Sequence, residues 1–161
     1  ESWQGPLGGS KDFDLKENQI EIKAKRTISK PKIKISSEDQ LEENPETNLF
    51  LAVFGIDFSE SKESKDLSEW CLYVEQEIEK RNPNLISQFN NLISEYGFDW
   101  EDDYTESKWE IKEIVYYKVT NDFPKIVGSK LSSGIDDVSY SLDMNELKDF
   151  EISKEDVLKA I

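Results

Sequence analysis

The chain has 161 residues, a formal net charge of −15 at pH 7, no histidine and one cysteine, Cys71. The lack of histidine excludes Cys–His and Ser–His catalysis and the commonest zinc sites, and one cysteine excludes an internal disulfide framework. The length is sufficient for one domain with its own core. No stretch has the length of a membrane span or the pattern of a signal peptide, so we expect a cytoplasmic protein without membrane segments.

The N-terminal part of the chain predicts a β-hairpin. A Gly/Pro loop at 5–10 precedes two stretches, within 11–26, in which apolar and charged residues alternate with the period of a half-buried strand. Polar residues 16–19 form the predicted turn. One set of side chains is expected to face a core: Phe13, Leu15, Ile20, Ile22 and Ala24. The other face is expected to carry the charges: Asp12, Asp14, Glu21, Lys23 and Lys25.

The remaining elements predict an α/β fold with a mixed β-sheet flanked by helices. Strands are expected at 31–35, at the continuous apolar run 49–56, at 109–120 and at 138–142. Helices are expected from 36 to about 41, 66–81, 83–97, 144–150 and 154–161, with an acidic loop at 99–107.

The predicted hairpin brings carboxylates together. If it closes symmetrically around its turn, Asp14 lies opposite Glu21 and Asp12 lies opposite Lys23. Two directly opposed carboxylates repel each other, and a divalent cation offsets that repulsion. With a lysine two residues along the strand, this constellation indicates metal-assisted cleavage of a phosphodiester.

The distribution of charge also indicates that the N-terminal segment contains the functional site. Residues 1–36 contain eight Lys or Arg and five Asp or Glu, whereas 37–161 contain twelve and thirty. The basic residues surround the candidate site: Lys23, Lys25, Arg26, Lys30, Lys32 and Lys34. The acidic remainder is expected either to face a partner protein or to reflect a general bias toward Lys, Glu, Ile and Asn.

Two alternative interpretations stay open at this point. Asp12, Glu21 and Lys23 are also compatible with a surface cross-strand charge pair. A similar pattern recurs where Asp102 and Asp103 precede Glu110 and Lys112, although in the most acidic stretch of the chain. An ordinary solvated strand face accounts for that second pattern.

Asp12 followed by Glu21-Ile22-Lys23 resembles the Asp…Glu-x-Lys signature of the PD-(D/E)XK nuclease superfamily. Beyond this signature, the chain resembles the C-terminal half of the bacterial family of PD-(D/E)XK motif proteins. The further matching pieces are Trp3-x-Gly5-Pro6, Asp12-Phe13, Ile35-Ser36-Ser37-x-x-Gln40-Leu41, Phe123-Pro124 and Val138-Ser139-Tyr140-Ser141-Leu142. The resemblance implies that 1–161 is a single restriction-endonuclease-like domain belonging to a longer protein.

The resemblance also assigns roles. Asp12 and Glu21 become metal-binding carboxylates, and Lys23 becomes the residue that orients or activates the attacking water. Gln40 matches the polar residue on the helix after the motif, where it positions water or substrate. Because Mg²⁺ takes oxygen ligands and keeps several waters, two carboxylates and the carbonyl of Ile22 suffice to hold it, and Mn²⁺ is an alternative ion. Asp14 is the runner-up carboxylate.

The sequence departs from the signature in two places. Lys11 stands where the signature has its first proline, and no helix precedes the hairpin to supply a further glutamate. The expected contacts to the DNA backbone come from Lys25, Arg26, Lys32 and Lys34.

We therefore expect a magnesium-dependent DNA endonuclease of a bacterial restriction or phage-defence system, since genes of this family tend to lie beside such genes. Its expected partners are DNA and other subunits of a defence complex. The alternative is a catalytically degenerate DNA-binding or scaffolding subunit of such a system. A third possibility is an acidic protein-interaction module with no nucleic-acid role.

Overall fold

This computed structural model describes residues 2–161, and of Pro6 the backbone alone. The described residues form two compact units. The smaller unit comprises residues 57–111, and the larger one combines 2–56 with 112–161.

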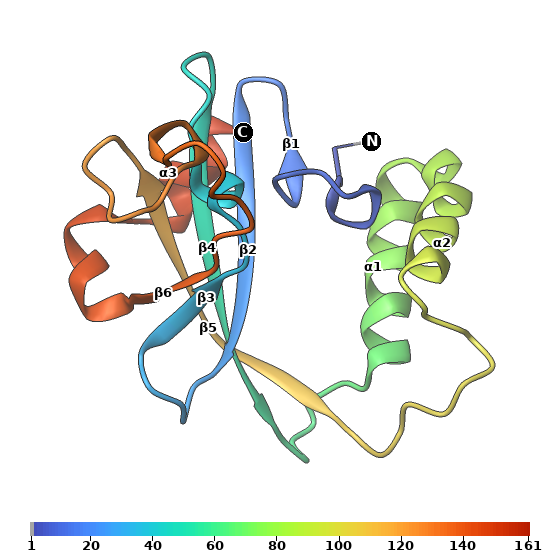
Figure 1. The fold of residues 1–161 in the computed structure, drawn as a ribbon. Helices are drawn as coiled ribbons and strands as arrows, with labels where there is room; N and C mark the ends of the chain where they lie inside the picture. The colour runs from blue at the N-terminus through green and yellow to red at the C-terminus, as the bar shows by residue number, and fades with distance from the viewer. Residues whose placement is uncertain (1) are drawn as a thin grey trace. The chain divides into compact units, whose positions relative to one another are not determined.

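The larger unit is organised by a mixed five-stranded sheet of order β1-β2-β4-β5-β7 (Figure 1). The strands are β1 (Phe13–Asp14), β2 (Asn18–Arg26), β4 (Asn48–Phe58), β5 (Trp109–Val119) and β7 (Glu151–Ile152). β2 pairs parallel with β4 over its whole length and antiparallel with the short strand β1. β7 pairs antiparallel with β5. The predicted α/β fold with a mixed sheet is therefore confirmed.

Shorter elements complete this unit. β3 (Lys32–Ile35) and β6 (Tyr140–Asp143) form a separate antiparallel pair. The segment predicted as a short helix after β3 is a 3-10 turn, η2 (Glu38–Leu41). The other elements are η1 (Gly5–Leu7), η4 (Gly128–Lys130), η5 (Met144–Phe150) and the helix α3 (Lys154–Ala160). The helix expected at 144–150 is thus a 3-10 helix, and the one expected at 154–161 is confirmed.

The hydrophobic core lies on one face of the sheet. The apolar run predicted as a central strand is β4, and Leu49, Leu51 and Val53 contribute to this core from alternate positions. The other buried members of the cluster are Ile33, Ile35, Leu41, Tyr117, Val119, Phe123, Leu142 and Leu147.

The opposite face of the sheet forms an apolar pocket of about 390 Å³. Ile20 and Ile22 of β2 line it together with Val157 and Leu158 of α3. Ala24, which was expected beside these residues in a core, is exposed. The core therefore covers one face of β2, whereas Ala24 and Arg26 near its C-terminal end are exposed.

The predicted register of the hairpin is wrong by two residues. Phe13 pairs with Ile20 and Asp14 pairs with Gln19, so Asp14 does not face Glu21. The turn is tighter than expected because Lys16 adopts a left-handed conformation with φ of 69° and the Leu15 N–H donates to the carbonyl of Asn18 at 2.8 Å. β2 therefore begins at Asn18.

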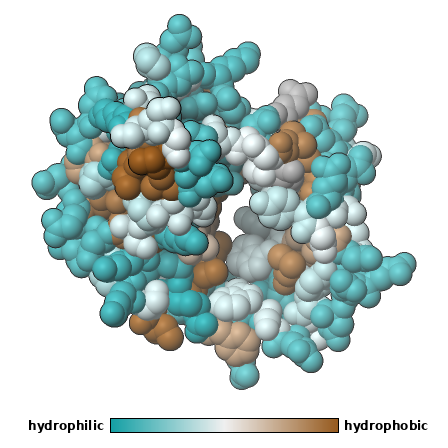
Figure 2. All heavy atoms as spheres, viewed as in Figure 1, coloured by the Kyte–Doolittle hydropathy of each residue, from teal (hydrophilic) through white to brown (hydrophobic). Residues whose placement is uncertain are grey.

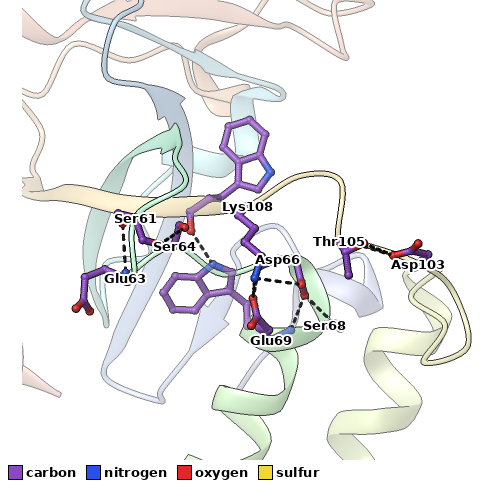
Figure 3. A network of polar contacts seen from close by, with 11 residues as sticks. Ser61, Glu63, Ser64, Asp66, Ser68, Glu69, Asp103, Thr105 and Lys108 are labelled. Carbon is purple, nitrogen blue, oxygen red and sulfur yellow. Dashed lines mark hydrogen bonds and ion pairs between the residues drawn. The ribbon is translucent and has the colours of Figure 1, made fainter.

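The smaller unit contains α1 (Leu67–Arg81), a 3-10 turn η3 (Pro83–Leu85) and α2 (Ile86–Glu95), close to the predicted helix bounds. Asp66 and Glu69 form a reciprocal capping box at the start of α1, with both N–H···O distances at 2.9 Å. The ammonium of Lys108 lies 2.9 Å from Oε2 of Glu69 and adds positive charge at this carboxylate pair (Figure 3).

Apolar burial in the smaller unit comes from α2 and the segment after it. Phe89, Leu92 and Ile93 of α2 are buried, as is Phe98. Residues 57–111 carry fifteen Asp or Glu and five Lys or Arg.

Hydrophilic residues cover most of the surface visible in Figure 2, as expected for a chain with 34% charged residues.

Within residues 2–161, none of the helices is both long enough and apolar enough to cross a membrane.

We expect Leu147→Ala to lower the free energy of unfolding by about 2–5 kcal/mol, because its side chain is 0% exposed and packs within the core. Chemical denaturation followed by far-UV circular dichroism measures this change. Leu158→Ala is the matched control, since Leu158 is 57% exposed, and it should change the free energy of unfolding by no more than about 0.5 kcal/mol. Equal losses in the two variants would contradict the placement of the core.

Candidate functional site

Asp12 lies immediately before β1, where continuation of the observed register places it opposite Glu21. Its carboxylate Oδ2 accepts a hydrogen bond from the Ile22 N–H at 2.8 Å. Its carbonyl accepts from the N–H groups of Gln4 and Gly5 at 2.8 and 3.2 Å. The Gly/Pro loop therefore packs on the backbone of Asp12, and the carboxylate is held against β2.

Glycine at position 5 permits this close approach. A Cβ there would lie 3.0 Å from Oδ1 of Asp12 and 3.2 Å from the indole nitrogen of Trp3. The Gly/Pro loop thus approaches the candidate carboxylate closely.

Glu21 is the buried carboxylate of the site, with 2% of its side chain exposed. In the parallel register it lies beside Leu51, and Lys23 lies beside Val53, so both charged residues share the face of the sheet that carries the core. The prediction that Glu21 and Lys23 share a face follows from strand alternation and agrees with this register. That this face would be covered by the core was not foreseen.

The electrostatics of Glu21 reflect its burial. Loss of hydration raises the pKa of its carboxyl from 4.5 to about 7, although the hydrogen bond and positive charge of Lys23 oppose this rise. The negative charge of Asp12 raises the pKa further. The carboxylates of Asp12 and Glu21 therefore interact in this structure, whereas the hairpin register expected from the sequence had opposed Glu21 with Asp14.

Lys23 and Gln40 complete the cluster. The ammonium of Lys23 lies 2.7 Å from Oε1 of Glu21 and donates to Oε1 of Gln40 at 2.8 Å. The same Gln40 oxygen accepts from the Ser36 N–H at 2.8 Å. The structure thus links three of the four predicted catalytic residues directly, and the fourth, Asp12, through the backbone of Ile22.

Lys11 is a member of this cluster that sequence reasoning missed. It is 6% exposed, and its ammonium donates to the carbonyl oxygen of Asp39. Burial lowers the pKa of Lys11, and the negative charge of Glu21 is the largest of the effects that oppose this. The available signal was its place directly before Asp12, which was interpreted only as a departure from the signature.

The runner-up carboxylate, Asp14, serves the turn. Its two oxygens accept from the Lys16 N–H at 3.3 Å and from the Gln19 side chain at 3.4 Å. Its side chain is exposed. These contacts stabilise the hairpin turn and leave Asp12 as the carboxylate held against the backbone next to Glu21.

The predicted DNA-backbone residues lie at the end of β2 and on β3. Burial alternates along β3, so that Lys32 and Lys34 are exposed while Ile33 and Ile35 enter the core. Arg26 is exposed, and Lys25 is half-buried with its ammonium on the carbonyl of Arg26 at 2.8 Å. These residues provide positive charge on the same β2–β3 segment that contains Glu21 and Lys23.

The competing pattern at Glu110 has a different environment. One oxygen of Glu110, Oε2, accepts from the hydroxyls of Ser59 and Ser61 at 2.9 and 2.6 Å. Asp103 accepts from the backbone and hydroxyl of Thr105, within the acidic loop shown in Figure 3. Through these contacts Glu110, on β5, is bound to serines that follow β4, whereas Asp103 belongs to its own local loop.

The donor set suits a hard divalent cation. The carboxylates of Asp12 and Glu21 and the carbonyl of Ile22 are all oxygen donors, and Mg²⁺ binds oxygen while retaining several waters. Across residues 2–161, no group of three or more His, Cys, Asp or Glu side chains is placed to hold a metal. Any ion here would therefore rely on two carboxylates, backbone and water.

We expect Glu21→Gln to change how stability depends on pH. Between about pH 4.5 and 7 the folded protein retains a proton that the unfolded chain releases, so Glu21 makes the free energy of unfolding fall as pH rises. The variant lacks this proton uptake. The free energy of unfolding of the variant minus that of wild type should therefore rise as the pH increases from about 4.5 to 7, and should level off above pH 7. The total rise is roughly 1.4 kcal/mol for each unit by which the folded and unfolded pKa values of Glu21 differ.

Urea titrations at several pH values measure this effect. Glu69→Gln is the control of opposite sign, because the hydrogen bond from Lys108 lowers the pKa of Glu69. A pH-independent difference between wild type and Glu21→Gln would show that the carboxyl is not perturbed by burial.

Comparison with known families identifies the chain. The model of the family described as "Putative PD-(D/E)XK family member, (DUF4420)" matches residues 1–145, a range that contains the whole cluster around Asp12 and Glu21. Comparisons with curated proteins and with solved structures give no match. The α/β architecture with its mixed sheet is consistent with a restriction-endonuclease-like fold. The chain therefore belongs to this PD-(D/E)XK family.

Proposed function

We propose that this protein is a magnesium-dependent DNA endonuclease of a bacterial restriction or phage-defence system. The observation that carries the proposal is the linked cluster of Asp12, directly before β1, with Glu21 and Lys23 on β2, in a chain of this family. The setting in a defence system, with partner subunits and a cytoplasmic location, rests on the family resemblance. That residues 1–161 form one domain of a longer protein stays a prediction.

The chemistry of the site assigns a task to each side chain. Asp12, Glu21 and the carbonyl of Ile22 would hold Mg²⁺ or Mn²⁺, and a bound ion lowers the pKa of a coordinated water and neutralises charge on the phosphate. Lys23 provides a fixed positive charge for the pentavalent species formed during phosphodiester hydrolysis. Gln40 holds the Lys23 ammonium through its amide oxygen.

The alternative, a catalytically degenerate DNA-binding or scaffolding subunit, has its own support. Among the described residues, the site itself contains two carboxylates, Asp12 and Glu21, and no group of three that could hold a metal. Glu21 already pairs with Lys23 at 2.7 Å. Burial also raises the pKa of Glu21 to about 7, which favours its protonated form below neutral pH. A degenerate subunit would keep the basic residues on β2 and β3 without cleaving DNA.

Nicking of supercoiled plasmid in Mg²⁺ tests the choice between these functions. We expect Glu21→Gln and Lys23→Met to slow nicking by about 10²–10³-fold, because the first removes a carboxylate that would hold the ion and the second removes a positive charge at the reacting phosphate. Glu110→Gln is the matched control and should leave nicking unchanged. Loss of nicking in Glu110→Gln alone would place the active site on β5 instead. Salt-sensitive DNA binding without cleavage by wild type would favour the degenerate subunit.

The salt dependence of DNA binding tests the proposed backbone contacts. Lys32→Ala and Lys34→Ala should each reduce the slope of log K against log salt concentration by about 1, because each removes one phosphate contact. Fluorescence anisotropy with a labelled duplex in Ca²⁺ or EDTA measures the slope. Lys80→Ala, an exposed lysine of the acidic smaller unit, is the control and should not change it. An equal change in all three variants would argue against a localised DNA-binding surface.

A further inference from the structure

We propose that Lys11 is a positioning residue of this site, whose ammonium fastens η2 to the hairpin and thereby holds Gln40 against Lys23. Its effect on catalysis rests on the proposed nuclease function. Its effect on the geometry of η2 does not, and the two are measured separately.

Lys11 is anchored at both ends. Its backbone precedes Asp12, whose carbonyl and carboxylate are hydrogen-bonded to η1 and β2. Its side chain is 6% exposed and ends on the carbonyl oxygen of Asp39, in the middle of η2. Because a buried ammonium without a partner is strongly unfavourable, this hydrogen bond restrains the position of Asp39.

Asp39 is followed directly by Gln40, the residue that contacts the catalytic lysine. Gln40 Oε1 accepts from the Lys23 ammonium and from the Ser36 N–H, both at 2.8 Å. Two ammonium groups from the hairpin segment therefore reach one 3-10 turn. Lys11 binds its main chain and Lys23 binds its side chain.

η2 depends on such tertiary contacts. It is a four-residue turn, and the side chain of its N-cap residue, Ser37, makes no capping hydrogen bond. Short 3-10 segments have poor internal hydrogen-bond geometry. Leu41 fixes one end of the turn in the core, and Lys11 fixes the carbonyl next to Gln40.

Burial also distinguishes Lys11 from a residue that binds substrate. Lys32 and Lys34 are exposed on β3, whereas Lys11 is 6% exposed and its ammonium is bound to the Asp39 carbonyl of η2. Lys11 therefore acts through Gln40 and Lys23, not on DNA directly.

The test uses Lys11→Met, which keeps the length of the side chain and removes its charge, and Lys11→Arg, which keeps the charge. Lys125→Met is the matched control. The Lys125 side chain is also 6% exposed, donates to the Thr120 carbonyl and pairs with Glu43, but it lies outside the site. Hydrogen exchange of the Ser36 amide reports the Gln40 contact without reference to activity, and nicking kinetics report kcat and KM.

We expect Lys11→Met to speed exchange at Ser36 about tenfold, comparable to losing one hydrogen bond, and to lower kcat by a similar factor with KM unchanged. Lys11→Arg should recover part of both effects. Lys125→Met should show neither at matched global stability. In a Gln40→Ala background, Lys11→Met should cause no further loss of kcat, because its effect passes through Gln40.

The proposal is overturned if Ser36 exchange is the same in Lys11→Met and wild type, or if the losses from Lys11→Met and Gln40→Ala multiply. Absence of nicking by wild type would contradict the nuclease function alone. In that case faster Ser36 exchange in Lys11→Met would still support the positioning role, and unchanged exchange would overturn it.

Discussion

The burial of the Glu21 carboxylate is the constraint on which the site depends. A carboxylate 2% exposed beside core residues loses most of its hydration, and only a close partner and further hydrogen bonds make its charged form tolerable. Lys23 supplies the partner, and Gln40 fixes Lys23. Because water screens this pair weakly, small displacements of either group change its electrostatics substantially. The arrangement is therefore energetically costly to assemble, and a cation bound between the carboxylates would change it strongly.

The elements that hold the residues of the site differ in how firmly they are fixed. Glu21 and Lys23 lie on β2, whose nine residues all pair with β4, so their positions are set by a continuous ladder. Asp12 lies before a strand of two residues, and its position depends on the Ile22 N–H and the contact with Gly5. Gln40 lies on a single 3-10 turn. The carboxylate with the most rigid support is thus the one whose burial is most unfavourable.

The sequence predicts the larger features because they depend on local patterns. Alternation along β2 places Glu21 and Lys23 on one face, and the apolar run of β4 marks the centre of the sheet. The hairpin register was wrong because the left-handed conformation of Lys16 shortens the turn, and lysine carries no signal for that conformation. The burial of Glu21 and Lys11 could not be predicted, because it results from η2 and the β3–β6 pair, which are remote in sequence or irregular.

The most direct test of the account is a crystal soaked in Mn²⁺, with the ion located by its anomalous scattering. We expect one ion within coordination distance of oxygens from Asp12, Glu21 and Ile22, with the Lys23 ammonium still beside it. Six-coordinate hard ions lie at about 2.0–2.2 Å from such oxygens. An ion bound only at other carboxylates, with the Lys23–Glu21 pair unchanged at millimolar Mn²⁺, would contradict this expectation.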